Sequence, residues 1–366
     1  MARLRRRAVL FVLGAALAMA VLPAFNLLRG VGLPANPGDL FDTGFAWPAV
    51  SGALRRIGVS TRPEQVIVGK SGWLFMGDHY AQAITAKRRP ADAGDRAAAE
   101  RVAVATRAWG AWLAAQGVTR WHVLVCADKD AIYPELLPDW YGPADVAAID
   151  VMLQRADPRI VVDSRADLRA ARSQPGPPLY LRTDSHWTAR GAWVAYRALA
   201  RAAAADNQGP AWLQEQDVRL RASRLPSGDL ARLLDAHGGE EDAAAAADIA
   251  GARDAGRTFA DAATDRVLGA SAPIGVRAPR RPLRIRSPAA LNAGRLLWVR
   301  DSFGSALLPY VAATFAEVIE VDREAISPAQ LAEFVRRFKP DSVLVSVAER
   351  NARATWFEAL PPASAQ

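Results

Sequence analysis

Short apolar runs alternate with helical stretches along the last third of the chain, and this alternation restricts the possible folds more than any other feature. Apolar runs predict buried strands over residues 295–299, 317–321 and 341–347, and the helical spacing of apolar residues predicts helices over 305–314 and 328–338. Strands that are joined through helices run parallel and need helices on both faces. The sequence therefore predicts an α/β fold with a mostly parallel sheet.

The middle of the chain continues this pattern and then interrupts it. Apolar runs over 121–126 and 160–162 predict two more strands, and Thr188 is a candidate N-cap for a helix that runs to about Ala204. Residues 205–290 differ, because an acidic and alanine-rich stretch is followed by runs rich in proline and arginine. We expect a loosely ordered, variable insertion there, within a single catalytic domain over residues 61–366.

Basic residues precede a long apolar stretch near the N-terminus. The four arginines are Arg3, Arg5, Arg6 and Arg7, and the apolar stretch covers residues 8–28. This pattern is typical of a secretory signal, or of a spanning helix, which needs about 20 apolar residues. We therefore expect residues 1–30 to be a signal peptide or a membrane anchor. An uncleaved anchor is favoured, because the apolar character continues beyond the small residues Ala18-Met19-Ala20, where a signal would be cleaved.

Charge and composition narrow the functional classes. The basic flank stays in the cytoplasm, so we expect a periplasmic protein that residues 8–28 anchor to the inner membrane. The formal net charge is +8, but no later stripe of basic and aromatic residues predicts a nucleic-acid partner. The one cysteine, Cys126, lies in a predicted strand, and no histidine and cysteine cluster predicts a metal site. Residues 31–60, which contain several prolines, are expected to be a linker.

The first motif with candidate catalytic residues is Thr183-Asp184-Ser185-His186-Trp187-Thr188. In an extended chain, residues two positions apart point the same way, so Asp184 and His186 can face one pocket. A catalytic imidazole needs a carboxylate on one ring nitrogen to fix its tautomer. Such triplets are also common in surface loops, so this motif alone does not decide the function.

The second motif, Arg300-Asp301-Ser302-Phe303-Gly304, lies between a predicted strand and a predicted helix. The carboxyl end of a strand is where an α/β enzyme places a nucleophile, and free N–H groups of the next helix can hold an oxyanion. Ser302 could instead only cap that helix. Taken together, Ser302, His186 and Asp184 form a complete set of nucleophile, base and orienting acid. The other histidines lie in less suitable places: His79, His122 and His237.

Several blocks of the sequence resemble those of a known family. Residues 180–188 look like the DxHW block of bacterial polysaccharide O-acetyltransferases of the alginate acetylation type, AlgJ and AlgX. Asp301-Ser302-Phe303 is similar to their nucleophile block, and residues 68–75, Val-Gly-Lys-Ser-Gly-Trp-Leu-Phe, to their GxxGWLF block. Residues 128–135 and 228–231 also have counterparts. Arg300 departs from the pattern, since a small residue often stands before the Asp-Ser pair.

The resemblance implies both a fold and a site. The fold would be an SGNH-hydrolase-like, flavodoxin-like sandwich, circularly permuted because the serine comes last. The triad would be Ser302, His186 and Asp184, with no cofactor and no metal. The partners would be a polysaccharide substrate, a membrane-bound protein that passes acetyl groups outward, and other polysaccharide-export proteins.

The function that follows is O-acetyl transfer through a serine acyl-enzyme to hydroxyls of an exported polysaccharide, alginate-like or another exopolysaccharide. Two alternatives stay open. A carbohydrate esterase would use the same triad with water as the acceptor, and a non-enzymatic protein could serve as a scaffold of a polysaccharide-export complex.

Overall fold

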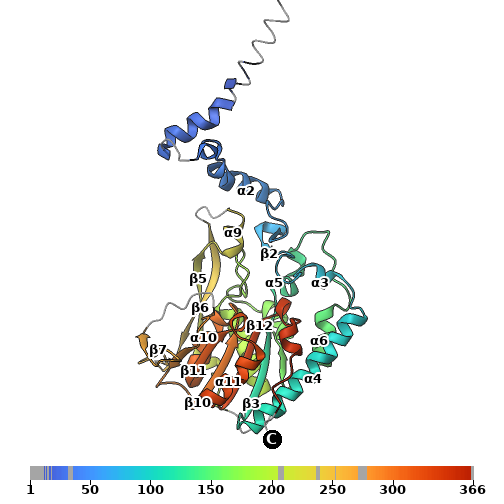
Figure 1. Ribbon diagram of the computed structural model, residues 1–366, viewed down its shortest axis with the longest axis vertical. Helices are drawn as coiled ribbons and strands as arrows, with labels where there is room; N and C mark the ends of the chain where they lie inside the picture. Colours follow the sequence, from blue (N-terminus) through green and yellow to red (C-terminus); the bar gives the residue numbers. More distant parts are fainter. Residues whose placement is uncertain are drawn as a thin grey trace, which may run out of the picture.

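One large sheet forms the core of the protein. The computed structural model describes residues 12, 14, 16, 17, 19–31, 36–204, 210–235, 240–251, 253–270 and 278–363. Helices lie on both sides of the sheet, and an N-terminal helical segment extends away from one end of this body (Figure 1). Within the described residues the sheet has eight strands in the order β4-β3-β12-β10-β11-β9-β7-β8, and two separate two-stranded sheets accompany it. The predicted α/β class is confirmed.

Five neighbouring strands of the large sheet run parallel. They are β4 (Val161–Asp163), β3 (Arg120–Cys126), β12 (Ser342–Ala348), β10 (Asn292–Arg300) and β11 (Phe315–Asp322). Each coincides with an apolar run of the sequence, because a strand covered on both faces is apolar throughout. β12 lies in the middle and is buried along its whole length.

The other three strands run antiparallel, so the sheet is mixed. β9 (Leu283–Arg286), β7 (Thr258–Asp261) and β8 (Val267–Gly269) extend it beyond β11. The alanine-rich run forms β6 (Glu241–Ile249), which pairs with β5 (Val218–Pro226) along its whole length. The described part of residues 205–290 is thus regular, and not the loosely ordered excursion that its composition suggests. Alanine is a weak strand former, but pairing with a long partner strand outweighs such a preference.

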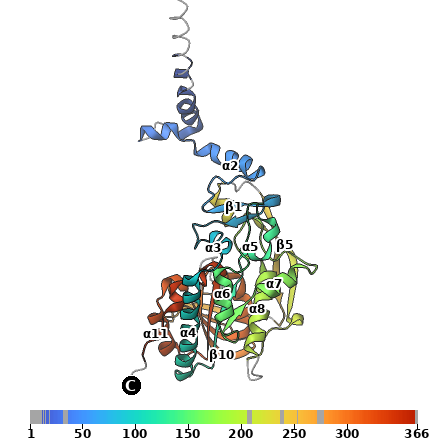
Figure 2. The ribbon, with the colours of Figure 1, turned by 90° about the vertical axis from the view of Figure 1, so that its right-hand side faces the viewer.

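Helices cover the two faces of the sheet in two groups (Figure 2). One group is α7 (Arg165–Arg172), α8 (Ala189–Ala203) and α10 (Gly304–Thr314); the other is α4 (Ala93–Ala115), α6 (Ala148–Arg155) and α11 (Pro328–Phe338). Successive side chains of β10 serve both groups, as expected for a strand. Leu296 and Trp298 pack with the first group, whereas Leu297 and Val299 pack with the second.

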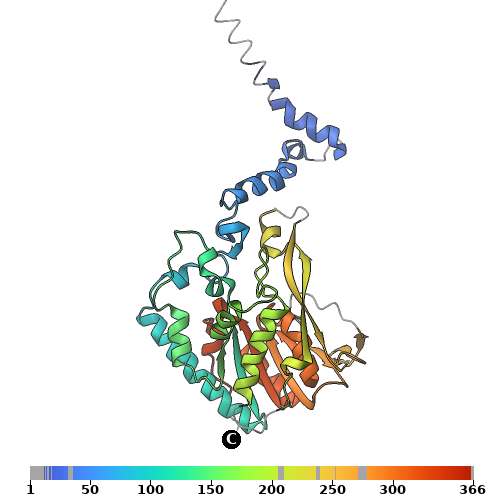
Figure 3. The ribbon, with the colours of Figure 1, turned by 180° about the vertical axis from the view of Figure 1, so that it is seen from behind.

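Short elements gather at the end of the sheet where the parallel strands finish (Figure 3). They are β1 (Val66–Val68), β2 (Leu74–Met76), α3 (Thr85–Arg88), α5 (Lys129–Ile132) and α9 (Asp229–Leu233). The carboxyl ends of parallel strands are the usual place for a site in an α/β fold. These elements therefore surround the edge at which Ser302 follows β10.

Residues 31–60 contain more regular structure than a linker would. They include the helix α2 (Trp47–Arg56) and the short helical turns Pro37–Phe41 and Gly44–Ala46. Pro37 and Pro48 lie in the first turns of their helices. Proline is tolerated there, because those backbone N–H groups have no partner within the helix. These two prolines therefore mark helix starts.

The apolar segment near the N-terminus is described only in part. Residues 8–11, 13, 15 and 18 of the expected anchor lie outside the described residues. Within the described part of the chain, no helix combines the length and the apolar character that crossing a membrane requires. The side-chain amide of Asn26 donates hydrogen bonds to the carbonyls of Leu40 and Asp42, at 2.8 and 2.9 Å. These bonds tie the segment to the helical turns that follow it.

Candidate active site

Ser302, His186 and Asp184 come together in one hydrogen-bonded row. The distance between Ser302 Oγ and His186 Nε2 is 2.8 Å, and that between His186 Nδ1 and Asp184 Oδ1 is 2.6 Å. With its proton on Nδ1, the imidazole donates to the carboxylate and accepts from the serine hydroxyl. The backbone N–H of His186 also donates to Asp184 Oδ1, at 2.9 Å. The two sequence motifs thus meet with the geometry of a nucleophile, a base and an orienting acid.

The carboxylate of Asp184 controls the charge state of His186. Burial lowers the pKa of His186, but the hydrogen bond and the negative charge of Asp184 outweigh burial and raise this pKa above 6.5. Burial raises the pKa of Asp184, but its hydrogen bond to His186 and the charge of His186 hold this pKa well below its usual range. The pair therefore favours an ionised Asp184 and the protonated form of His186.

A tight turn presents Ser302 at the end of β10. Asp301 Oδ1 accepts a hydrogen bond from the Phe303 N–H at 3.0 Å, and Asp301 Oδ2 accepts one from the Ala348 N–H at 2.7 Å. Asp301 thus shapes the turn, and among the described residues it forms no hydrogen bond or ion pair with His186. The N-cap position of α10 belongs to Phe303, so Ser302 is not the cap. Within the described part of the chain, the Ser302 N–H has no acceptor and is available to an oxyanion.

Trp187 joins the histidine loop, residues 181–187, to the turn that carries Ser302. Its indole N–H donates to the carbonyl of Phe303 at 3.0 Å, and its ring packs edge-on against the Phe303 ring, 5.1 Å between centroids. The ring of His186 also lies 5.1 Å from that of Phe303. Trp187 is 2% exposed, so it serves as a buried connection between the two motifs.

Comparison with known proteins fits this geometry. The family described as "SGNH hydrolase-like domain, acetyltransferase AlgX" matches residues 66–276, more than half of the chain. The chain belongs to this family. The AlgX-type match includes Asp184 and His186 but ends before β10, so the assignment of Ser302 depends on the geometry above. No curated protein matches the chain.

Solved structures extend the likeness beyond the AlgX-type match. PatB1 of Bacillus cereus is 15% identical with a TM-score of 0.59, and the similarity covers 80% of this chain and 98% of PatB1. A DHHW family protein from Eubacterium siraeum is 16% identical with a TM-score of 0.54, over 83% and 98% of the two chains. At such identities these structures show a shared fold. The O-acetyltransferase domain of Pseudomonas putida AlgJ is 17% identical with a TM-score of 0.46, over 82% and 95%.

Arg300, the departure from the AlgX-type pattern, forms a buried ion pair beneath the nucleophile. Arg300 and Glu320 are 1% and 2% exposed, and Arg300 Nε lies 2.6 Å from Glu320 Oε2. Arg300 Nη1 also donates to the carbonyl of Asp301 and to Ser305 Oγ, both at 3.1 Å. Arg300 thus connects the turn to the neighbouring strand β11, on which its partner Glu320 lies.

Asp229 is a second carboxylate at the triad, and sequence reasoning missed its role. Its Oδ1 accepts from the Ser185 N–H at 2.7 Å, and its Oδ2 accepts from Ser185 Oγ at 2.6 Å. Its backbone N–H donates to Asp184 Oδ2 at 2.9 Å. Asp184, His186 and Asp229 place ligand atoms within 4.8 Å of one another, a spacing that could hold a cation. All four carboxylate oxygens accept protein hydrogen bonds, which suits a set that orients His186.

Gly228 allows α9 to approach Asp184. A Cβ atom at this position would lie 2.1 Å from the Cβ of Asp184 and 2.5 Å from its Oδ2. The Gly228 N–H donates to Thr183 Oγ1 at 2.8 Å, and Thr183 donates in turn to Asp242 through both its N–H and its hydroxyl, at 2.8 Å each. Residues 228–231 could be found from the sequence, because they have counterparts in the family that the sequence resembles. No sequence feature pointed to Asp242, because it lies within the acidic and alanine-rich run.

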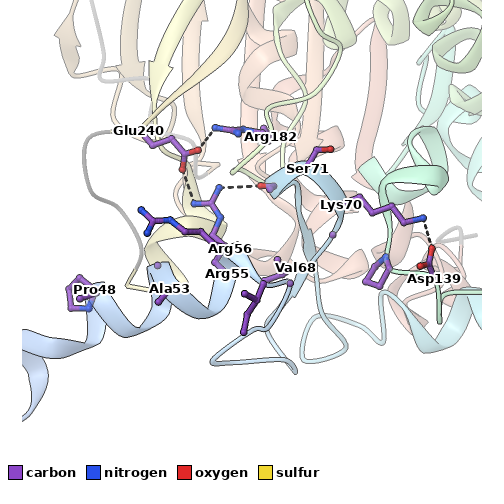
Figure 4. Close-up of a pocket in the computed structure, with 17 residues that line it drawn as sticks. Pro48, Ala53, Arg55, Arg56, Val68, Lys70, Ser71, Asp139, Arg182 and Glu240 are labelled. Carbon is purple, nitrogen blue, oxygen red and sulfur yellow. Dashed lines mark hydrogen bonds and ion pairs between the residues drawn. The ribbon is translucent and has the colours of Figure 1, made fainter.

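A pocket lies beside the histidine loop, on the side of α2 (Figure 4). Its volume is about 1180 Å³, and the side chains of Arg55, Arg56, Lys70 and Arg182 line it together with Glu240 and Asp139. Arg55 and Arg182 both pair with Glu240, and Lys70 pairs with Asp139. Arg182 stands two residues before Asp184, so the loop that holds Asp184 also forms a wall of this pocket.

Proposed function

We propose that this protein is a serine-dependent O-acetyltransferase that moves acetyl groups to hydroxyls of an exported polysaccharide. The observation that carries the proposal is the hydrogen-bonded row from Asp184 through His186 to Ser302, in a chain of the AlgX acetyltransferase-domain family. The row supplies an activated serine hydroxyl, and membership of an acetyltransferase family indicates that the acyl group it transfers is acetyl.

In the first half of the reaction, Ser302 Oγ forms a bond to the carbonyl carbon of an acetyl ester donor. His186 Nε2 takes the hydroxyl proton, and the tetrahedral oxyanion points to the Ser302 N–H. The intermediate collapses, the bond from carbon to the donor oxygen breaks, and His186 gives its proton to the departing alcohol. The product is acetyl-Ser302, and Asp184 stabilises the imidazolium throughout.

In the second half, a sugar hydroxyl gives its proton to His186 Nε2 and attacks the acetyl carbon. Ser302 Oγ leaves and takes the proton back, so the enzyme returns to its starting state. The pocket that Arg182 helps to line is large enough for several sugar residues. Ser302, His186 and Asp184 do not line this pocket, so an acceptor chain held there would have to extend past Arg182 to reach acetyl-Ser302.

The proposal places the reaction in the periplasm, with residues 8–28 as the inner-membrane anchor, residues 31–60 between anchor and body, and residues 61–366 as the catalytic domain. The basic flank and apolar run of the sequence support this arrangement. The donor would then come from a membrane-bound partner that passes acetyl groups outward. Fractionation of cells should recover the full chain with membranes, and recovery in the cytoplasm would contradict the location.

The decisive experiment follows the acetyl group. The full chain is incubated with 4-nitrophenyl acetate and with neutral or uronate-containing oligosaccharides, and protein and sugar are analysed by mass spectrometry. We expect one acetyl group on the Ser302 peptide and then acetylated sugar. Ser302→Ala should lose both, with an effect on the order of 10⁶-fold, as in other serine–histidine enzymes. Ser173→Ala, at an exposed serine after α7, is the matched control.

The same experiment separates the alternatives. Free acetate in the presence of excess sugar would identify an esterase. Normal acetylation of the cell's polymer by Ser302→Ala would contradict catalysis by this serine and would favour a scaffold.

A further inference from the structure

Lys129 is a buried cation that the proposed reaction does not use. It is 3% exposed and follows β3, at the start of α5. Its ammonium donates three hydrogen bonds, all to backbone carbonyls: Leu181 at 2.9 Å, Arg182 at 3.2 Å and Asp184 at 2.7 Å. Among the described residues, no carboxylate pairs with Lys129 in an ion pair. The three donors of a lysine are thus spent on one short stretch of backbone.

That stretch is the part of the histidine loop that carries the catalytic acid. Residues 181–185 have no helix or strand conformation, so their own backbone bonds do not fix them. The Arg182 carbonyl also accepts from the Leu74 N–H at 2.9 Å, and the Leu181 N–H donates to the His186 carbonyl at 3.2 Å. Lys129 therefore adds three fixed points to a turn that has few of its own.

Two aromatic rings complete the surroundings of this ammonium. Lys129 Nζ lies 5.5 Å from the ring centroid of Trp73 and 5.3 Å from that of Phe75. At these distances the faces of aromatic rings attract a cation. Both rings belong to the Gly-Trp-Leu-Phe block of residues 72–75, which the catalytic row does not touch. Through these two rings, residues 72–75 hold the ammonium of Lys129 next to the histidine loop.

We infer that Lys129 is a positioning residue, whose ammonium fixes the backbone of residues 181–184 so that the Asp184 carboxylate meets His186. This inference deepens the proposed function and rests on it for its effect on the rate. Its structural part, the alignment of Asp184 with His186, can be measured without any reaction.

Lys87 offers an instructive contrast, because it is also buried. Its ammonium pairs with carboxylates, at 2.7 Å from Asp130, 3.3 Å from Asp128 and 3.5 Å from Glu349. Burial lowers the pKa of Lys87, but these charges outweigh burial and raise it. Lys87 thus neutralises buried acids, whereas Lys129 holds neutral carbonyls.

The surroundings of Lys129 make its protonation sensitive to mild alkali. Burial lowers its pKa to about 8, although the charges of Asp184, Asp229, Asp242 and Asp130 all act to raise it. A neutral amine has only two N–H donors for the three carbonyls. We therefore expect the rate of acyl-enzyme formation to decline as the pH rises through about 8.

The test compares Lys129→Met, Lys129→Arg and the unchanged chain. Methionine keeps an unbranched side chain but removes every donor, and acylation by 4-nitrophenyl acetate at pH 7 should slow by about 100-fold, the cost of misplacing a catalytic group by about 1 Å. Lys129→Met should lower the maximal acylation rate more than it raises the donor concentration that gives half of that rate. Arginine stays charged, so the decline near pH 8 should disappear in a Lys129→Arg chain. Lys339→Met, at the exposed end of α11, is the control.

A second measurement does not depend on activity. The four histidines are titrated by NMR, and His186 is identified by its loss in His186→Gln. A displaced Asp184 no longer raises the pKa of His186, so this pKa should fall in Lys129→Met. An unchanged His186 titration in folded Lys129→Met would overturn the inference. If the unchanged chain forms no acetyl-enzyme, the proposed function fails, but the NMR result still decides the role of Lys129.

Discussion

The nucleophile turn and the histidine loop reach the same catalytic row by different means. Residues 300–304 connect β10 to α10, so two regular elements fix both ends of the turn. Residues 181–185 have neither helix nor strand, and their supports come from other parts of the chain. Lys129 reaches them from the end of β3, and Asp229 and Asp242 reach them from α9 and β6.

This difference shows that one half of the site is positioned by local structure and the other by distant side chains. Changes to the nucleophile turn should therefore act on the chemistry or on the stability of the fold. Changes around the histidine loop should mainly move Asp184 and His186, with the sheet left intact. The predictions below test this division, beginning with the largest effect.

Asp184→Asn and Asp301→Asn compare the acids of the two regions. Asp184→Asn should reduce the acylation rate by about 10⁴-fold, because other triads lose this much when the orienting carboxylate becomes an amide. Asp301→Asn should cost about tenfold or less, since it removes one of the two hydrogen bonds that shape the turn. Single-turnover kinetics with 4-nitrophenyl acetate measure both. Equal losses of rate would show that Asp301 acts in the reaction itself and does not only shape the turn.

Glu320→Ala tests the support beneath Ser302. It leaves Arg300 buried without its partner, so the free energy of unfolding should fall by about 3–5 kcal/mol. Urea unfolding followed by circular dichroism gives this value, and Glu358→Ala, which breaks the exposed pair with Arg101, should change it far less, because water screens that pair. A small effect of Glu320→Ala would mean that regular structure alone holds the turn.

Gly228→Ala tests the loop by its closest contact. The added methyl group would lie 2.1 Å from the Cβ of Asp184, so the acid must move. The acylation rate should fall by about 100-fold. Gly142→Ala, where an added Cβ meets nothing within 4 Å, should keep the rate of the unchanged chain. A normal rate for Gly228→Ala would contradict the view that α9 sets the position of Asp184.

The pH dependence gives the smallest but most specific effect. Only neutral imidazole can accept the serine proton, so the acylation rate should rise with pH through the pKa of His186, which is raised above 6.5. In Asp184→Asn the hydrogen bond and the charge are weakened while burial remains, so the midpoint should move to lower pH. A midpoint that stays in place would mean that Asp184 does not control the protonation of His186.

The same division explains what could be predicted from the sequence. Ser302 follows a continuous apolar run, and such a run marks a buried strand whose end is a recognisable place for a nucleophile. The spacing of Asp184 and His186 is also local, so the pair could be found. Lys129 and Asp242 contact the loop from positions more than fifty residues away, and no periodicity in a single sequence encodes such pairings.

Two further differences arise from local patterns with more than one meaning. Proline in residues 31–60 suggests irregular chain, yet Pro37 and Pro48 begin helices, where the missing N–H has no cost. The alanine-rich run suggests weak structure, yet it forms β6, because a long partner strand compensates for its poor preference. In both places the composition is compatible with two structures, and the position in the helix or the partner strand decides between them.

The position of β12 also has a consequence for the order in which the protein can be made. Among the described residues it is the last strand in sequence, yet it lies between β3 and β10, and its pairing with β3 joins residues more than two hundred positions apart. During synthesis, β3 leaves the ribosome long before its neighbour exists, and one edge of an apolar strand stays open to pairing with other chains. The sheet therefore cannot close before β12 has been made, and any chain that stops before Ser342 keeps an open seam between β3 and β10.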